Sequence, residues 1–311
     1  MNSIQAIHSN NLLITDESIC NSFFEYVDVR PKSLETYKTA LRQFFKYLSD
    51  NGITNPTRAD IIAYRDYLMQ NHKANTVQGY LTAVKIFFSW LEQEGLYKDV
   101  AKHVKGVTIS KEHKRDYLTQ HQSRRLLDSV DTSTTKGKRD FALIALLITT
   151  GMRTIEAQRA NVGDMETIGG YTVLFLQGKG RDEKAEYVKV AEPVEDAIRD
   201  YLACRGAKAV KKTDPLFAST SNHNPGERMT TRSIRRIVKG DMIAAGFNSD
   251  RLTAHSLRHT AATLNLLNGG TLEETQQLLR HSNINTTMIY SHALERAGNQ
   301  SESRIASGLF S

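Results

Sequence analysis

Residues 254–290, AHSLRHTAATLNLLNGGTLEETQQLLRHSNINTTMIY, predict two helices joined by a short turn and followed by a polar segment that ends in a tyrosine. The first helix extends from Ala254 to Asn268, because the Gly269-Gly270 pair that follows stops a helix. The second begins after Thr271, whose spacing to Glu274 is that of a capping box, and it continues to Arg280. This stretch makes the C-terminal half mainly helical.

The remainder of the C-terminal half combines helices with a small sheet. Alternating and β-branched residues predict strands at Tyr171–Leu176 and at 186–190, with a hairpin between them over residues 178–184. We therefore expect a mainly α domain with a small antiparallel sheet over residues 117–295. Its other predicted helices are 120–130, 138–150, one that begins near Thr154, 192–205 and 230–245.

The N-terminal part predicts a separate bundle of four helices. Apolar residues recur at helical spacing through residues 15–94, and Thr15-Asp-Glu has the composition of a helix start. Residues 106–116 are polar and basic without an apolar period, which is typical of a linker. The predicted organisation is a short extension at 1–14, a helical domain at 15–105, the linker, the domain at 117–295, and a tail at 296–311 that is polar until Leu309-Phe310.

Composition sets broad limits on the function. A chain of 311 residues suits two domains, and a net charge of +7, most of it after residue 110, permits a polyanionic partner without requiring one. Cys20 and Cys204 form no disulfide framework or metal-binding pattern. Neither an export signal nor a run of ~20 apolar residues is present, so we expect a cytoplasmic protein with no membrane contact.

The C-terminal half carries the groups needed to break and rejoin a phosphodiester without a metal. Two arginines can hold a phosphate bidentately, lysine and histidine can move protons, and a tyrosine hydroxyl can attack phosphorus. His255 and His259 have the i, i+4 spacing of a metal-binding pair, but Ser256 stands where a zinc hydrolase has glutamate. The candidate residues are Arg153, Lys179, His255, Arg258, His281 and Tyr290.

The order of these residues resembles the tyrosine recombinases of the phage integrase family, over about residues 15–295. The matching segments are Thr150-Gly-Met-Arg153-Thr-Ile-Glu156, Gly178-Lys179-Gly180 in a β-hairpin, His255-Ser-Leu-Arg258-His259-Thr, and Leu278-Leu-Arg-His281 leading to Tyr290. The family usually has leucine where Ala157 stands. The resemblance implies an N-terminal four-helix, SAM-like core-binding domain and a C-terminal catalytic domain.

The resemblance also implies roles for the matched residues. Arg153 and Arg258 would clamp the scissile phosphate, and Tyr290 would attack it. Lys179 would protonate the leaving 5′ oxygen, with Arg181 and Lys184 as nearby alternatives for this role. His255 would aid proton transfer from the nucleophile, and His281 would bond to a non-bridging oxygen. The spacing of three residues, apart from the resemblance, lets Glu156 share a helix face with Arg153 and orient it, with an exposed helix acid as the alternative. His259 is expected to be a hydrogen-bonded interior residue.

DNA contacts are expected from basic side chains outside the catalytic set. Each of them has the alternative of a simple solvated surface charge. The candidates are Lys38, Arg42, Lys46, Lys73 and Lys85 on the solvated faces of the helical domain, and Arg181 and Lys184 near the hairpin tip.

We therefore expect a DNA strand transferase that uses a 3′-phosphotyrosine intermediate and needs no metal, ATP or other cofactor. Its partners would be double-stranded DNA, three further copies of the chain, and accessory DNA-bending or directionality proteins, in the nucleoid of a prokaryotic host. The first expected role is integration of a mobile element or phage, with Xer-like dimer resolution or inversion as the alternative. A type IB topoisomerase, a non-catalytic DNA-binding protein and a metal hydrolase are more distant alternatives.

Overall fold

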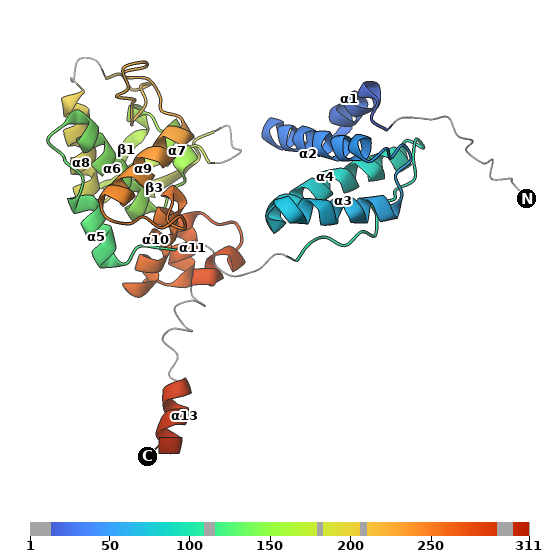
Figure 1. Ribbon diagram of the computed structural model, residues 1–311. Helices are drawn as coiled ribbons and strands as arrows, with labels where there is room; N and C mark the ends of the chain where they lie inside the picture. The colour runs from blue at the N-terminus through green and yellow to red at the C-terminus, as the bar shows by residue number, and fades with distance from the viewer. Residues whose placement is uncertain (1–13, 109–115, 179–182, 206–209, 291–300, 311) are drawn as a thin grey trace, which may run out of the picture. The chain divides into compact units, whose positions relative to one another are not determined.

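The computed structural model of the protein describes residues 14–108, 116–178, 183–205, 210–290 and 301–310. The chain forms two compact units, residues 1–112 and 113–311 (Figure 1). Lys179 and Arg181, two candidates from the sequence, lie outside the described residues. Within the described part, no helix combines the length and apolar character needed to span a membrane.

The first unit is a bundle of four helices. Asp16, rather than the predicted Thr15, caps the first helix: its carboxylate accepts the backbone N–H of Ser18 at 2.7 Å. Thr57 and Asp60 form a capping box at the third. The helices are α1 (Glu17–Tyr26), α2 (Pro31–Asp50), α3 (Arg58–Asn71) and α4 (Ala74–Gln93).

Aromatic side chains fill the core of this bundle. Phe44 packs edge-on against Tyr64 with ring centroids 5.0 Å apart, and Phe23 packs in the same way against Phe87 at 5.1 Å. These side chains are fully buried, and edge-to-face pairs of this kind stabilise a core beyond the area that they bury.

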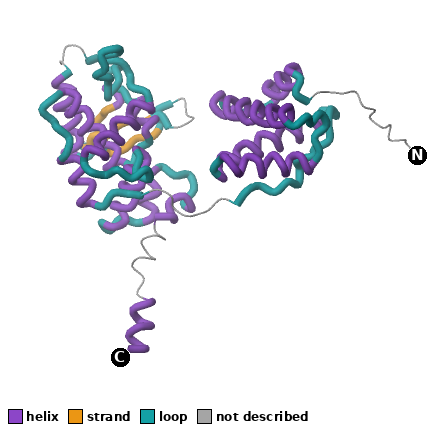
Figure 2. Tube along the Cα trace, in the orientation of Figure 1, coloured by secondary structure: helices purple, strands orange, loops and turns teal. Residues whose placement is uncertain are grey.

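The second unit is mainly helical and contains the only strands among the described residues (Figure 2). Its antiparallel sheet has the order β1-β2-β3, with Leu174 of β2 opposite Val188 of β3. The strands are β1 (Met165–Ile168), β2 (Tyr171–Leu176) and β3 (Glu186–Lys189), and a 3-10 turn, η1 (Val162–Asp164), precedes them. The helices are α5 (Gln120–Asp128), α6 (Thr135–Thr150), α7 (Thr154–Arg159), α8 (Glu192–Cys204), α9 (Thr231–Ala244), α10 (Ala254–Leu267) and α11 (Leu272–Leu279).

The sequence prediction missed β1. This strand has four residues, three of them exposed, so it lacks the apolar alternation of a half-buried strand. Gly169 and Gly170, both at positive φ, form the tight turn that connects it to β2. A Gly-Gly pair between two short extended runs is a hairpin signal, and it was available in the sequence.

Helix α6 lies at the centre of the second unit and packs mainly against α8 and α10. It ends at Gly151, whose φ of 58° suits glycine. A Cβ on Gly151 would lie 2.7 Å from Cδ2 of Leu279, so the missing side chain lets the end of α11 approach the end of α6. The junction places Arg153 two residues later, as the N-cap of α7.

The C-terminal tail contains a helix that the sequence analysis did not assign, α13 (Ser301–Phe310). Two of its apolar side chains, Ile305 and Leu309, are 63% and 71% exposed. Ile305 and Leu309 are four residues apart, so both lie on one face of this helix.

Candidate active site

Arg258, on α10, is the most deeply placed cation of the site. Its side chain is buried, and its guanidinium donates to the carbonyl oxygens of Gly151, at 2.6 Å, and Leu279. These carbonyls lie at the C-terminal ends of α6 and α11, where backbone oxygens lack helical partners. A guanidinium has five N–H groups, so Arg258 retains donors for an anion while it bonds to these two carbonyls.

Arg153 and Glu156 form an ion pair at the start of α7. The Glu156 carboxylate accepts the backbone N–H of Arg153 at 2.6 Å and its Nη1 at 2.9 Å, and the carboxylate side chain is fully buried. The Arg153 side chain remains 31% exposed. The sequence prediction that Glu156 could orient Arg153 is consistent with this contact.

The structure adds a residue that sequence reasoning missed, Arg280. Its Nη2 donates to the second oxygen of Glu156 at 2.8 Å, so the carboxylate lies between two arginines. The partners are 124 residues apart in the chain, and no local pattern connects them. The only available signal was an arginine at the helix stop directly before His281.

Arg153 and Arg280 lie close enough to Arg258 for their charges to act on it. Burial, together with the positive charges of Arg153 and Arg280, lowers the pKa of Arg258 to about 10, so this side chain stays protonated at neutral pH. Burial acts to raise the pKa of Glu156, but Arg280 and Arg153 hold it below its ordinary value. Three cations around one carboxylate leave two positive charges in excess, which favours binding of an anion.

Tyr290 is buried beside the same helix. Its Oη lies 2.6 Å from Nδ1 of His259, the residue after Arg258. Tyr290 is close enough to Arg258 to affect the pKa of that guanidinium. His255 is exposed, and its ring packs edge-on against the ring of His259, with centroids 4.9 Å apart. The phenol therefore contacts His259 in this structure.

His281 follows Arg280 on the same side of the site. Its Nδ1 lies 2.9 Å from Oγ1 of Thr287, a fully buried hydroxyl. Partial burial and the charges of Arg258, Arg153 and Arg280 lower the pKa of His281 to about 4, so the imidazole is neutral at neutral pH. If Thr287 donates to Nδ1, the proton of His281 is on Nε2, which can then donate to an anion.

The hairpin end of the sheet is described in part. Lys184, a predicted DNA contact, pairs with Asp164 at 2.5 Å and is 26% exposed. Arg159, the last residue of α7, donates to the carbonyl oxygen of Gly178 at 3.0 Å, which fastens the end of β2 to α7. Gly178 is the residue directly before Lys179 in the chain.

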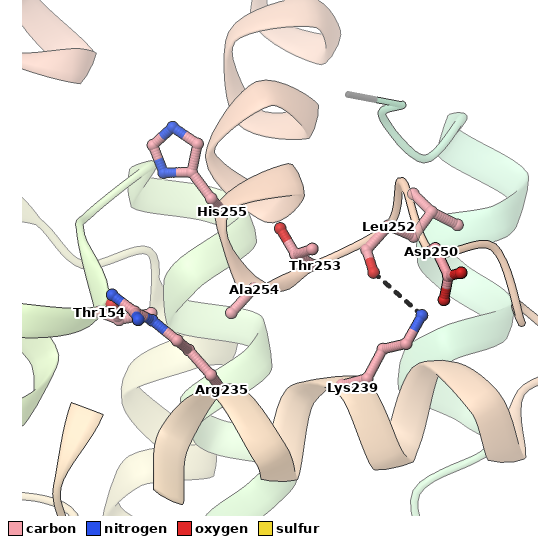
Figure 3. Close-up of a pocket in the computed structure, with 8 residues that line it drawn as sticks. All are labelled: Thr154, Arg235, Lys239, Asp250, Leu252, Thr253, Ala254 and His255. Atoms are coloured by element: carbon pink, nitrogen blue, oxygen red, sulfur yellow. Dashed lines mark hydrogen bonds between the residues drawn. The ribbon is translucent and has the colours of Figure 1, made fainter. Parts of the chain in front are cut away.

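A hollow of about 650 Å³ lies between α9 and the start of α10, with His255 on its rim (Figure 3). Lys239 donates to the carbonyl oxygens of Ser249 and Leu252, which fastens its ammonium group at this wall. Three arginines of α9, Arg232, Arg235 and Arg236, share a helix face with Lys239, because positions i, i+3, i+4 and i+7 lie on one side of a helix. Sequence reasoning did not single out these side chains. The basic face of α9 consists of Arg232, Arg235, Arg236 and Lys239.

The predicted basic residues of the helical unit differ in exposure. Arg42 and Lys73 are exposed, Lys46 pairs with Asp50 at 2.9 Å, and Lys38 is near Glu35 at 3.8 Å. Lys85 is half-buried, and its Nζ donates to the carbonyl oxygen of Val104 at 2.5 Å. The prediction of a solvated face is therefore wrong for Lys85, because its ammonium closes the end of the bundle.

The arrangement is suited to nucleophilic attack on a bound phosphate ester. A phenol, a histidine in contact with it, and a group of fixed cations are the elements that such a reaction uses. Among the described residues, no three His, Cys, Asp or Glu side chains are grouped so that they could hold a metal ion.

Comparison with known proteins gives family matches over both units. Residues 116–296 match the model of the phage integrase family, and residues 21–95 match the phage integrase N-terminal SAM-like domain. Tyrosine recombinase XerC of Thermodesulfovibrio yellowstonii is 29% identical over 270 residues, which cover 84% of this chain and 85% of that protein.

Solved structures share the fold. XerH recombinase bound to a palindromic difH substrate, in a post-cleavage complex, has a TM-score of 0.70 and 23% identity, with 93% of this chain and 90% of that chain covered. A lambda integrase tetramer bound to a Holliday junction has a TM-score of 0.69 and 17% identity, with 88% and 76% covered. Both units of the chain therefore have counterparts in known structures.

Proposed function

Because the chain belongs to the phage integrase family of tyrosine recombinases, we propose that it cleaves and rejoins DNA strands at specific sites through a 3′-phosphotyrosine intermediate. The observation that carries the proposal is the contact of Tyr290 with His259, next to the cationic Arg258. These three residues supply, on neighbouring elements, a nucleophile, a proton acceptor and a positive charge that can bind the phosphate.

In the proposed cleavage step, Oη of Tyr290 attacks the scissile phosphorus and the bond from phosphorus to the 5′ oxygen breaks. The phenol has an ordinary pKa of ~10, so its proton must leave as the new bond forms. His259 accepts this proton at Nδ1, provided that its own proton is on Nε2. Arg153, Arg258 and His281 donate to the non-bridging oxygens and stabilise the charge of the pentacoordinate transition state.

The leaving 5′ oxygen requires a proton, because an alkoxide departs poorly. We assign this general acid to Lys179, as the family resemblance implies. The contact of Arg159 with Gly178, the residue before Lys179, supports the assignment, since it ties Gly178 to α7, the helix whose N-cap is Arg153. Lys184 fits less well because its ammonium is paired with Asp164.

The phosphotyrosine ester conserves the energy of the broken bond, so the reverse attack by a 5′ hydroxyl needs neither ATP nor a divalent metal. This independence is tested by cleavage in excess chelator without nucleotide. A loss of cleavage that only a divalent metal restores would contradict it and favour a metal hydrolase.

DNA affinity is expected to come mainly from phosphate contacts, which salt weakens. We assign such contacts to the basic face of α9, and to Arg42 and Lys73 in the helical unit, because these side chains are exposed or line a hollow beside His255.

Strand exchange between two duplexes needs four protein copies, one for each strand. The exposed apolar side chains of α13 support a further proposal, that the tail docks on a neighbouring copy. Deletion of residues 300–311 is expected to reduce assembly on DNA. Unchanged assembly of the shortened chain would remove this role for α13.

Two biological roles fit the chemistry. Integration of a mobile element is our first candidate, and Xer-like resolution of chromosome or plasmid dimers is the second, which the XerC relative favours. The test uses plasmids with two element-end sites or two chromosomal dimer-resolution sites. Recombination at only one kind of site identifies the role.

The decisive experiment is incubation with a nicked DNA site, which traps a covalent intermediate because the cleaved fragment diffuses away. The native protein should give a protein–DNA band that survives denaturant, and Tyr290→Phe should bind DNA with the same salt dependence and give none. An unaltered band with Tyr290→Phe would exclude the proposed nucleophile. Ligation of the trapped strand to a different duplex separates a recombinase from a type IB topoisomerase.

A further inference from the structure

The backbone of Arg280 has an unusual conformation. It ends α11 in the left-handed region, with φ 54° and ψ 48°, and it is the only residue other than glycine with positive φ in the described part of the chain. The positions just after the C-caps of α2, α4 and α9 use Gly52, Gly95 and Gly246 for the same geometry. A side chain with a Cβ is disfavoured there and glycine is not, so the strain points to a use for the arginine side chain.

The side chain of Arg280 is directed into the site rather than into solvent. It is 8% exposed, and it donates to Oε2 of Glu156 at 2.8 Å and to the carbonyl oxygen of Leu278 at 2.9 Å. Arg153 donates to the other oxygen, Oε1, through Nη1. Nε and Nη2 of Arg153 make no hydrogen bond within the described residues, and this side chain is partly exposed.

We propose that Arg280 is a positioning residue, which bonds to Oε2 of Glu156 so that the Arg153 guanidinium holds the carboxylate by one nitrogen and keeps its other N–H groups for the scissile phosphate. The proposal rests on the recombinase function proposed above, because it concerns the same phosphate.

The effect follows from the preferred geometry of arginine with carboxylate. An arginine and an unoccupied carboxylate form two parallel N–H···O bonds. Without Arg280, Oε2 of Glu156 would accept only the backbone N–H of Arg153, and the guanidinium could turn to close on both oxygens. The turned guanidinium would offer fewer donors to the phosphate, with the substrate still bound by the rest of the DNA interface.

The first test compares the native protein with Arg280→Gly and Arg280→Asn, since both glycine and asparagine tolerate the left-handed backbone. Single-turnover formation of the covalent intermediate on the nicked site is expected to slow by about 10- to 100-fold, as for other misplaced catalytic groups. The dissociation constant for DNA should change little, because Arg280 is buried. Cleavage at the native rate by either folded variant would overturn the proposal.

A double-mutant cycle tests whether Arg280 acts through Glu156. In a Glu156→Gln protein, the further change Arg280→Gly should slow cleavage by a much smaller factor than Arg280→Gly does alone, because the carboxylate that Arg280 positions is gone. An equal loss of cleavage rate in the native and Glu156→Gln backgrounds would overturn the proposal and indicate that Arg280 acts on the phosphate independently of Glu156.

The matched control is Arg205→Ala. Arg205 is also the C-cap of a helix and donates to a loop carbonyl, that of Pro215, at 2.7 Å, but within the part of the chain that the structure describes it bonds to no residue of the site. Its cleavage rate should equal that of the native protein. If the native protein itself forms no covalent intermediate, the proposed function fails, whereas a native intermediate with an unaffected Arg280→Gly rate removes only this inference.

Discussion

The interiors of the two units of this chain differ in their content of buried polar and charged side chains. Among the described residues, every buried polar or charged side chain lies in the unit of residues 113–311, and the helical bundle has only apolar and aromatic residues in its core. Burial of charge is costly unless the charge is paired and hydrogen-bonded. A unit that buries charged side chains despite this cost uses them either for structure or for chemistry.

A structural cluster of buried charges lies near the start of α6, and a chemical cluster lies beyond its end. Near its start, Arg139 pairs with Asp140 at 2.7 Å and donates to Ala218 and Thr220, a closed group with no cation in excess. Beyond its end, Arg153, Arg258 and Arg280 surround the single carboxylate Glu156. The balanced cluster ties elements together, and the unbalanced cluster leaves positive charge for a ligand.

Replacement of the two buried arginines by lysine should separate these clusters most strongly. Arg258→Lys is expected to reduce single-turnover cleavage by about 10³-fold, since lysine lacks the fork that bonds two carbonyls and a phosphate together. Arg139→Lys should lower the melting temperature and leave the cleavage rate of the folded protein unchanged. Equal losses of cleavage in both variants would mean that the two clusters do not differ in use.

Removal of the one anion among the three arginines should have the next largest effect. Glu156→Gln is expected to destabilise the protein by about 3 kcal/mol, because it leaves buried cations without a counter-charge. The pKa of Glu156 is lowered in the folded state, so its contribution is present above the ordinary value of 4.5 and is lost as the pH falls through the folded value.

The measurement for Glu156 is chemical denaturation at several pH values. The stability difference from the native protein should be full at pH 7 and should shrink below pH 4.5. The control is Glu195→Gln, which removes a pair between a partly buried carboxylate and the exposed Arg199 and should cost about 1 kcal/mol or less. A loss for Glu156→Gln no larger than that of the control would show that the cluster is not electrostatically coupled.

The same contrast explains what could be predicted from the sequence. The end of α6 at Gly151 and the start of α11 at the Thr271 capping box follow local rules, so the position of Arg153 directly after α6 was predictable. Partners that meet only through tertiary packing were not. Examples are Arg280 with Glu156, 124 residues apart, and Tyr290 with His259, 31 residues apart.

Asp241 offers a smaller test at the structural end of α6. Burial and the nearby Asp140 raise its pKa from 3.8 to about 6, and its Oδ2 is buried without a hydrogen-bond partner. Ionisation of Asp241 therefore disfavours the folded state as the pH rises from 3.8 through 6. Asp241→Asn should raise the melting temperature by a few degrees at pH 8, about 1 kcal/mol, and by less at pH 4.5. A melting temperature lowered at pH 8 would contradict this interpretation.

The smallest expected effect concerns the helical unit, whose cations lie at the surface. Arg42 is exposed, so its loss should leave the folding and the single-turnover cleavage rate at saturating protein unchanged. Arg42→Ala is expected to weaken DNA binding a few-fold and to reduce the slope of log affinity against log salt by about one, the signature of one phosphate contact. The control is Lys46→Ala, whose ammonium already pairs with Asp50 and which should change the slope less. If Arg42→Ala slowed cleavage at saturation without a change of slope, surface cations of the bundle would act in the chemistry, and the division between the two units would not hold.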